Sequence, residues 1–114
     1  MSGDRSAFCQ ALLDRFDGCY ESPGGEVWVR YADALEAVDL ADRMGIRLLG
    51  MEGFLVDGTY VFPAMSRIAD FGDADTATAQ TTARSLLTGT WAERPHDVHS
   101  DAKGEYLIDL AVAD

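Results

Sequence analysis

The stretch that decides the fold runs from Ile46 to Phe62 and has the sequence IRLLGMEGFLVDGTYVF. Two apolar runs flank Asp57-Gly58, and an Asp-Gly pair in this setting is the strongest short-range sign of a β-hairpin, since type I′ turns need positive φ angles. Gly50 and Gly53 interrupt the first run around Glu52, which predicts a bulge or bend. We therefore expect two hairpin-linked strands here.

The chain upstream of the hairpin alternates between helical and extended patterns. Residues 6–16 carry apolar side chains at every fourth position, which predicts an amphipathic helix, and residues 27–31 (Val-Trp-Val-Arg-Tyr) predict a strand. Asp33 and Glu36 have the spacing of an N-terminal capping box, and Gly45 is placed as a left-handed C-terminal cap. A second helix is therefore expected between them.

Downstream of the hairpin, Pro63 is expected to end its second strand. Residues 64–73 follow no clear period and are expected to form a loop, whereas residues 75–88 predict a third helix. After a polar loop, residues 106–112 alternate between apolar and other side chains, which predicts a last strand with one strongly apolar face.

These elements predict one α+β domain over residues 1–114. Their order is an N-terminal helix followed by βαββαβ, which is the ferredoxin-like arrangement. Right-handed crossovers would place the second and third helices on one face of a four-stranded sheet.

Charge is the strongest compositional signal. Twenty Asp and Glu oppose nine Lys and Arg, for a formal net charge of -11. Such a field repels nucleic-acid backbones and anionic lipids, which argues against both as direct ligands, and it attracts a basic protein partner. No apolar run approaches the roughly 20 residues that span a bilayer, and residues 1–5 lack the features of a secretory signal, so a cytoplasmic protein is expected.

Two groups of residues are candidates for binding such a partner. Glu36, Asp39 and Asp42 follow the polar side of the second helix, and Trp28 and Arg30 share one face of the first strand. Each group has a plainer interpretation, because acidic helix faces also serve solubility and Trp28 could belong to the core.

Glu52 is the one candidate for a catalytic residue. A carboxylate between glycines in an apolar hairpin could act as a general base if it were held in a cleft, with Arg47 or Arg67 as its charge partner. It could instead be a structural acid that braces the bulge. Familiar enzyme motifs such as GxSxG, a P-loop or HExxH are absent, which favours a protein that is not an enzyme.

A weaker alternative is a metal site in the polar loop, where His96, His99 and Asp101 offer nitrogen and oxygen ligands. An HxxH pair in a loop fixes no geometry, so a solvated loop is the competing interpretation and no cofactor is expected. Cys9 and Cys19 lack metal-ligand spacing, and a disulfide is not expected between them.

The sequence Gly45-Ile46-Arg47-Leu48-Leu49-Gly50-Met51-Glu52-Gly53-Phe54, with Asp57-Gly58, Pro63 and Ile68-Ala69-Asp70-Phe71, resembles the core of small uncharacterised bacterial proteins. This resemblance covers residues 27–71 and the last strand, and it implies a fold more than a function. In size and charge the chain is also similar to toxin-neutralising immunity proteins, by analogy only.

Two hypotheses follow. The first is a non-enzymatic acidic module that binds a basic protein, in its most concrete form an immunity or antitoxin-type inhibitor. The second is a small-molecule or enzymatic site around Glu52, with Tyr60, Trp28 or Tyr106 as walls, enclosed by a homodimer.

Overall fold

The last strand of the chain lies at the centre of the sheet. The computed structural model describes residues 4–95 and 104–113, and its strands form one five-stranded sheet in the order β1-β2-β5-β3-β4. All neighbouring pairs are antiparallel. The strands are β1 (Tyr20–Glu21), β2 (Val27–Arg30), β3 (Leu48–Asp57), β4 (Tyr60–Asp70) and β5 (Glu105–Val112).

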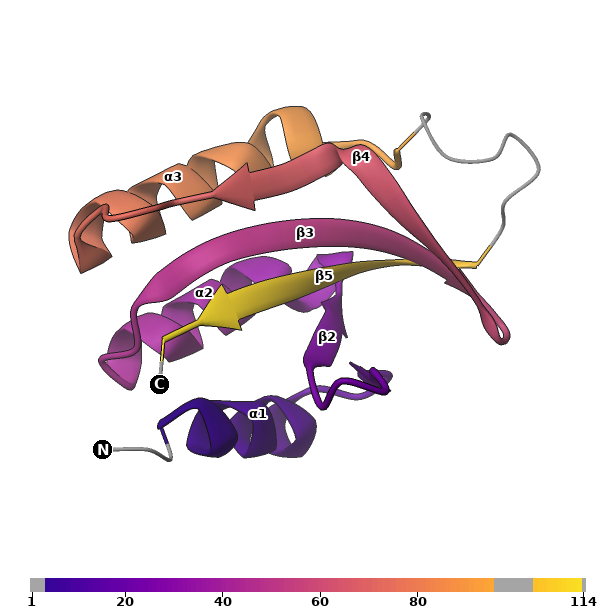
Figure 1. Ribbon diagram of the computed structural model, residues 1–114, viewed down its shortest axis with the longest axis horizontal. Helices are drawn as coiled ribbons and strands as arrows, with labels where there is room; N and C mark the ends of the chain where they lie inside the picture. The colour runs from indigo at the N-terminus through magenta and orange to yellow at the C-terminus, as the bar shows by residue number, and fades with distance from the viewer. Residues whose placement is uncertain (1–3, 96–103, 114) are drawn as a thin grey trace.

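Three α-helices accompany the sheet. They are α1 (Asp4–Arg15), α2 (Tyr31–Arg43) and α3 (Thr76–Thr88), and α3 is followed by a short 3-10 helix, η1 (Thr90–Ala92). Helices α2 and α3 contact each other and cover one face of the sheet, while α1 lies beside the edge that β2 forms (Figure 1). The expected α+β class, with an N-terminal helix first and the later helices on one face, is therefore confirmed.

The core forms between that face and the helices. Ile108, Leu110 and Val112 of β5 are buried there, as the alternation in the last strand predicted. They are joined by small residues of the helices, which let the backbones approach the sheet closely, among them Ala34, Ala37, Ala41, Ala79 and Ala83.

The ferredoxin-like strand order is not what the structure shows. That arrangement would place the first strand of βαββαβ, here β2, in the interior of the sheet. Instead β4 and β5 occupy the two edges of β3, and β2 pairs with β5. The β2 strand then lies near the edge and gains a short neighbour, β1, from the segment between α1 and β2.

The central hairpin is confirmed, with a correction to its turn. Asp57 pairs with Tyr60, so the connecting residues are Gly58 and Thr59. Gly58 has a φ of 62°, and no described residue other than glycine has a positive φ. One positive angle at the first position is the pattern of a type II′ turn, whereas type I′ would need two.

The predicted irregularity in β3 is also present. The register with β4 shifts between Glu52 and Phe54. At Gly53 a Cβ would lie 2.7 Å from Cβ of Arg67 and 3.1 Å from the ring of Tyr106, so only glycine allows this approach.

The prediction of a loop over residues 64–73 is wrong, because β4 continues through Pro63 to Asp70. The register shift breaks the alternation of side chains that would have revealed a strand. Pro63 is tolerated because β4 is an edge strand, where a missing N–H costs no ladder hydrogen bond on the open side.

The helix ends differ in part from expectation. The capping box at Asp33 is wrong: α2 already begins at Tyr31, and Asp33 lies in its first turn, 3.5 Å from the guanidinium of Arg30. Gly45 does adopt a left-handed φ of 69° after the helix. Helix α3 is confirmed, with the Asp75 side chain accepting a hydrogen bond from the N–H of Thr78 at 2.8 Å.

One buried polar group in the core is unsatisfied. Gln80 of α3 is 2% exposed, and neither polar atom of its amide has a hydrogen-bond partner. Replacing it by an apolar side chain of similar shape removes this desolvation cost. We expect Gln80→Met to raise the free energy of unfolding by about 1–2 kcal/mol, measured by urea denaturation.

The matched control is Gln10→Met on α1, where the amide is exposed and donates to Asp14 at 2.9 Å. This variant should change stability by less than about 0.5 kcal/mol. A loss of stability in Gln80→Met would show that the amide contributes to the core after all.

Candidate binding site

No described helix covers the other face of the sheet. Because side chains alternate along a strand, the register places Trp28 of β2, Asp109 of β5 and Glu52 of β3 side by side on this uncovered face. On the same face Ile68 lies opposite Glu52, and Phe54 pairs with Leu107 further along the strands. We call the face defined by these six residues the uncovered sheet face.

An aromatic stack lies across the middle of this face. The rings of Trp28 and Phe54 are parallel within 7°, with their centroids 4.0 Å apart, although β5 separates their strands. Tyr20 packs against the other side of Trp28 at 4.9 Å. Trp28 is therefore only 6% exposed, and its indole N–H is buried without a hydrogen-bond partner. Arg30, its neighbour on the same strand face, is exposed.

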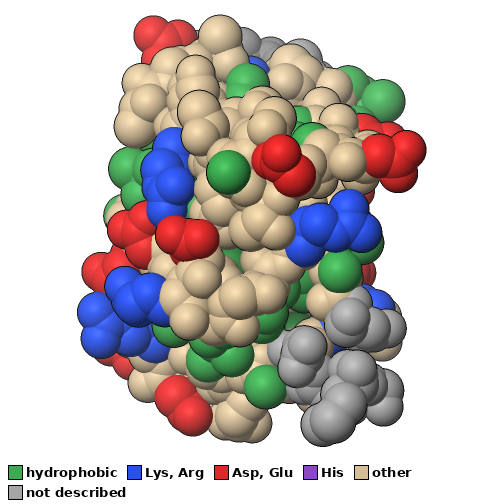
Figure 2. Space-filling view, turned by 90° about the vertical axis from the view of Figure 1, so that its left-hand side faces the viewer, with side chains coloured by type: hydrophobic (Ala, Val, Ile, Leu, Met, Phe, Trp, Pro, Cys, Tyr) green, Lys and Arg blue, Asp and Glu red, His purple; other side chains and the backbone are tan. Residues whose placement is uncertain are grey.

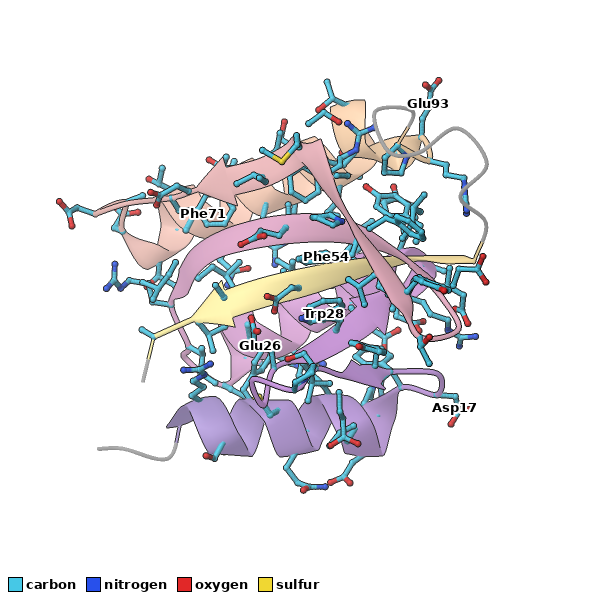
Figure 3. All side chains as sticks on the ribbon, turned by 45° about the vertical axis from the view of Figure 1, so that its right-hand side comes forward. Asp17, Glu26, Trp28, Phe54, Phe71 and Glu93 are labelled. Atoms are coloured by element: carbon cyan, nitrogen blue, oxygen red, sulfur yellow. The ribbon has the colours of Figure 1, made fainter. Side chains whose placement is uncertain are left out.

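A carboxyl group is buried beside this stack. Asp109 is 6% exposed and shares a hydrogen bond with the carboxyl of Glu26. The hydroxyl of Ser22 donates a hydrogen bond to Oε1 of Glu26 at 3.3 Å. Burial, the bond to Glu26 and the negative charges of Glu26 and Glu52 raise the pKa of Asp109 to about 8, while Arg5 opposes the rise. The pair can therefore share a proton near neutral pH. Figure 3 labels Glu26, which immediately precedes β2, and Trp28 of that strand.

These carboxyl groups form no ion pair. Within residues 4–95 and 104–113, no Lys or Arg nitrogen lies within 4.0 Å of Glu26, Glu52 or Asp109. Arg5 is close enough to act on Asp109 through its charge but forms no ion pair with it. None of these three carboxyl groups therefore forms an ion pair inside the described structure.

The acidic residues of α2 are arranged differently. Glu36 lies 2.6 Å from Arg15 of α1, and Asp39 and Asp42 lie 2.7 and 3.8 Å from the same guanidinium, that of Arg84 on α3. Acidic and basic side chains are also interspersed over the end of the molecule shown in Figure 2. These acids tie the helices together, and their charge is largely balanced within the chain.

Glu52 is exposed rather than held in a cleft. Neither Arg47 nor Arg67 forms an ion pair with it, and Arg67 instead donates to the backbone carbonyl of Glu93 at 3.1 Å. Of the proposed walls, Trp28 shares the face of Glu52, whereas Tyr106 faces the helices and stacks on Tyr31 at 5.0 Å.

The other candidates do not join this face. Tyr60 lies next to the hairpin turn and is 70% exposed. His96, His99 and Asp101 fall outside the described residues, and the described part of the chain contains no group of three His, Cys, Asp or Glu side chains that could hold a metal ion. Cys9 and Cys19 are free thiols whose pKa is raised by burial.

A cavity of about 180 Å³ opens next to the carboxyl pair, between α1 and the part of β5 that extends past the end of β2.

Sequence reasoning missed Asp109 and Glu26. The signal available was an acid in the middle of an apolar strand, Leu107-Ile108-Asp109-Leu110, although that pattern alone also fits an exposed alternating position.

Comparison of the chain with protein-family models, with curated proteins and with solved structures found no match. In the described part of the chain, no helix is long and apolar enough to cross a membrane. The function must therefore be argued from the geometry of the site itself.

The raised pKa of Asp109 makes a testable statement about stability. A carboxyl group with a pKa raised above its unfolded value of 3.8 binds a proton more strongly in the folded state. The free energy of unfolding therefore falls as the pH rises from about 4 to about 8. We expect Asp109→Asn to raise the free energy of unfolding at pH 8 by about 1–3 kcal/mol and to flatten its decline between pH 5 and pH 8.

Urea denaturation at a series of pH values measures this effect. Glu105→Gln is the control, because Glu105 begins the same strand and is exposed, and its profile should follow the unsubstituted protein. A pH profile of Asp109→Asn that parallels the unsubstituted protein would contradict the assignment of the proton to this group.

Proposed function

We propose that this protein is a non-enzymatic acidic module that binds a basic protein through the uncovered sheet face. Its most concrete form is an immunity or antitoxin-type inhibitor, which blocks a basic partner by occupying its surface. We place this activity in the cytoplasm of a bacterial cell, in keeping with the sequence expectation.

The difference between paired and unpaired acids carries the proposal. On α2, Glu36, Asp39 and Asp42 already have Arg15 or Arg84 as partners, so a second protein would have to compete for them. Glu52 of the uncovered sheet face and the nearby Asp109 and Glu26 have no Lys or Arg nitrogen within 4.0 Å in the described structure. A partner's Lys or Arg would supply the missing charge.

The apolar residues of this face suit the same role. Phe54 is half-buried against Trp28, and Ile68 is 51% exposed beside Glu52. Protein interfaces combine an apolar, aromatic centre with a polar rim that adds specificity and faster association. The stack is already ordered in the free protein, so little conformational entropy is lost when a partner docks on it.

The alternative of a small-molecule or enzymatic site around Glu52 in a homodimer has less support. Glu52 is exposed, and Tyr106 lies on the opposite face of the sheet. A homodimer that packed two acidic faces together would also bring like charges into contact, which costs binding energy.

The deciding experiment compares two charge reversals in affinity capture from the cells that carry this gene, followed by affinity measurement on the purified partner. Glu52→Lys changes the uncovered sheet face, and Glu36→Lys makes the same change on α2. We expect a basic protein to be retained by the unsubstituted chain and by Glu36→Lys, and its Kd to rise about tenfold or more with Glu52→Lys.

Salt provides a second readout, because an electrostatic complex should weaken as ionic strength rises. Loss of capture with Glu36→Lys and retention with Glu52→Lys would move the binding surface to α2. Equal capture by all three proteins, or a partner without basic character, would overturn the proposal.

A further inference from the structure

The cavity between α1 and β5 has the features of a binding site for a small cationic ligand. Its walls are mainly apolar and come from α1, from β2 and from the last residues of β5. The wall side chains include Phe8, Leu12, Val27, Leu110 and Val112. An engineered apolar cavity of about 150 Å³ holds a benzene-sized molecule, so a cavity of about 180 Å³ fits a ligand of about six heavy atoms.

Two carboxyl groups and one guanidinium complete the lining. Asp109 and Glu26 line the cavity from the sheet, and Arg5 lines it from α1. Asp109 is more than nine-tenths buried and shares a hydrogen bond with the carboxyl of Glu26. When both carboxyl groups are ionised they need a cationic or hydrogen-bond-donating partner, and the cavity beside them has room for one.

We propose that this cavity binds a primary alkylammonium group, with the cationic head at Asp109 and Glu26 and the alkyl chain among the apolar walls. An ammonium has three donors, enough to reach both carboxyl groups at once. A chain of about five carbons fills the remaining length. Neither Glu52 nor Phe54 lines this cavity, and only Asp109 belongs to both sites, so this proposal does not rest on the proposed docking function.

The charges around the cavity predict how binding responds to pH. Glu26 and Glu52 raise the proton affinity of Asp109, Arg5 lowers it, and the Cys9 thiol in the wall has a pKa raised by burial. Below pH 8 the ammonium must displace the proton that Asp109 holds. Affinity should therefore rise up to about tenfold per unit between pH 6 and pH 8 and level off above, while the amine itself stays protonated.

Replacing Arg5 tests the direction in which the affinity for the cation changes. Its positive charge opposes an incoming cation, so removing it should strengthen binding, whereas a residue that merely supports the cavity would weaken binding when changed. We expect Arg5→Gln to lower the Kd of the ammonium ligand by about threefold or more at about pH 9.5, where Asp109 is ionised, since one like charge is removed; at lower pH the competing proton gains as much as the ligand.

The experiment is calorimetric titration of the full chain with n-pentylammonium, with 1-pentanol as the neutral analogue of equal size. We expect saturable binding of the ammonium and at least about tenfold weaker binding of the alcohol. Asp109→Asn should weaken ammonium binding about tenfold and abolish its pH dependence. Glu105→Gln is the matched control, because Glu105 lies on the same strand as Asp109 but is exposed and outside the cavity, and it should change the Kd less than about threefold.

Circular dichroism establishes that each variant folds, and Glu26→Gln, expected to weaken binding about fivefold, serves if Asp109→Asn does not fold. Nα-acetyl-lysine methylamide distinguishes the source of the ligand: binding of it as well as pentylammonium indicates a lysine side chain, and binding of pentylammonium alone indicates a free amine. Absence of saturable pentylammonium binding up to about 10 mM, equal binding of the alcohol, or unchanged affinity in both carboxyl variants would overturn the proposal.

Discussion

The pairing of β5 between β2 and β3 is the constraint on which the rest of the structure depends. It joins the segment before α2 to the central hairpin, and it lets α2 and α3 share one apolar surface. On the side of β2, it also leaves the last residues of β5 without a strand neighbour, and α1 covers those residues incompletely. The same pairing therefore creates both the core and the cavity.

The elements that the sequence predicted well are those with a local physical cause. The hairpin follows from Asp57-Gly58, and α3 follows from the N-cap at Asp75 and its apolar spacing. The continuation of β4 was not predictable, because a register shift removes the alternation that marks a strand. Strand order was equally out of reach, since it depends on which edges of β3 remain free after long-range pairing.

The candidate site shows the same division. Net charge pointed to a basic protein partner, but charge in a sequence carries no information about pairing. Arg15 and Arg84 are distant in sequence from the α2 acids that they neutralise, while Glu26 and Asp109 become neighbours only when β5 reaches its place beside β2. The aromatic stack of Trp28 and Phe54 likewise joins two strands across a third.

The central place of β5 also sets the order in which the protein can fold as it is synthesised. The hairpin of β3 and β4 can form early, but the inner edge of β3 has no partner until residues 105–112 have left the ribosome. During that interval an apolar strand presents free backbone N–H and C=O groups, which is the feature that promotes pairing between chains. The nascent protein is thus most prone to aggregation just before its last strand arrives, and least prone once that strand has closed the sheet.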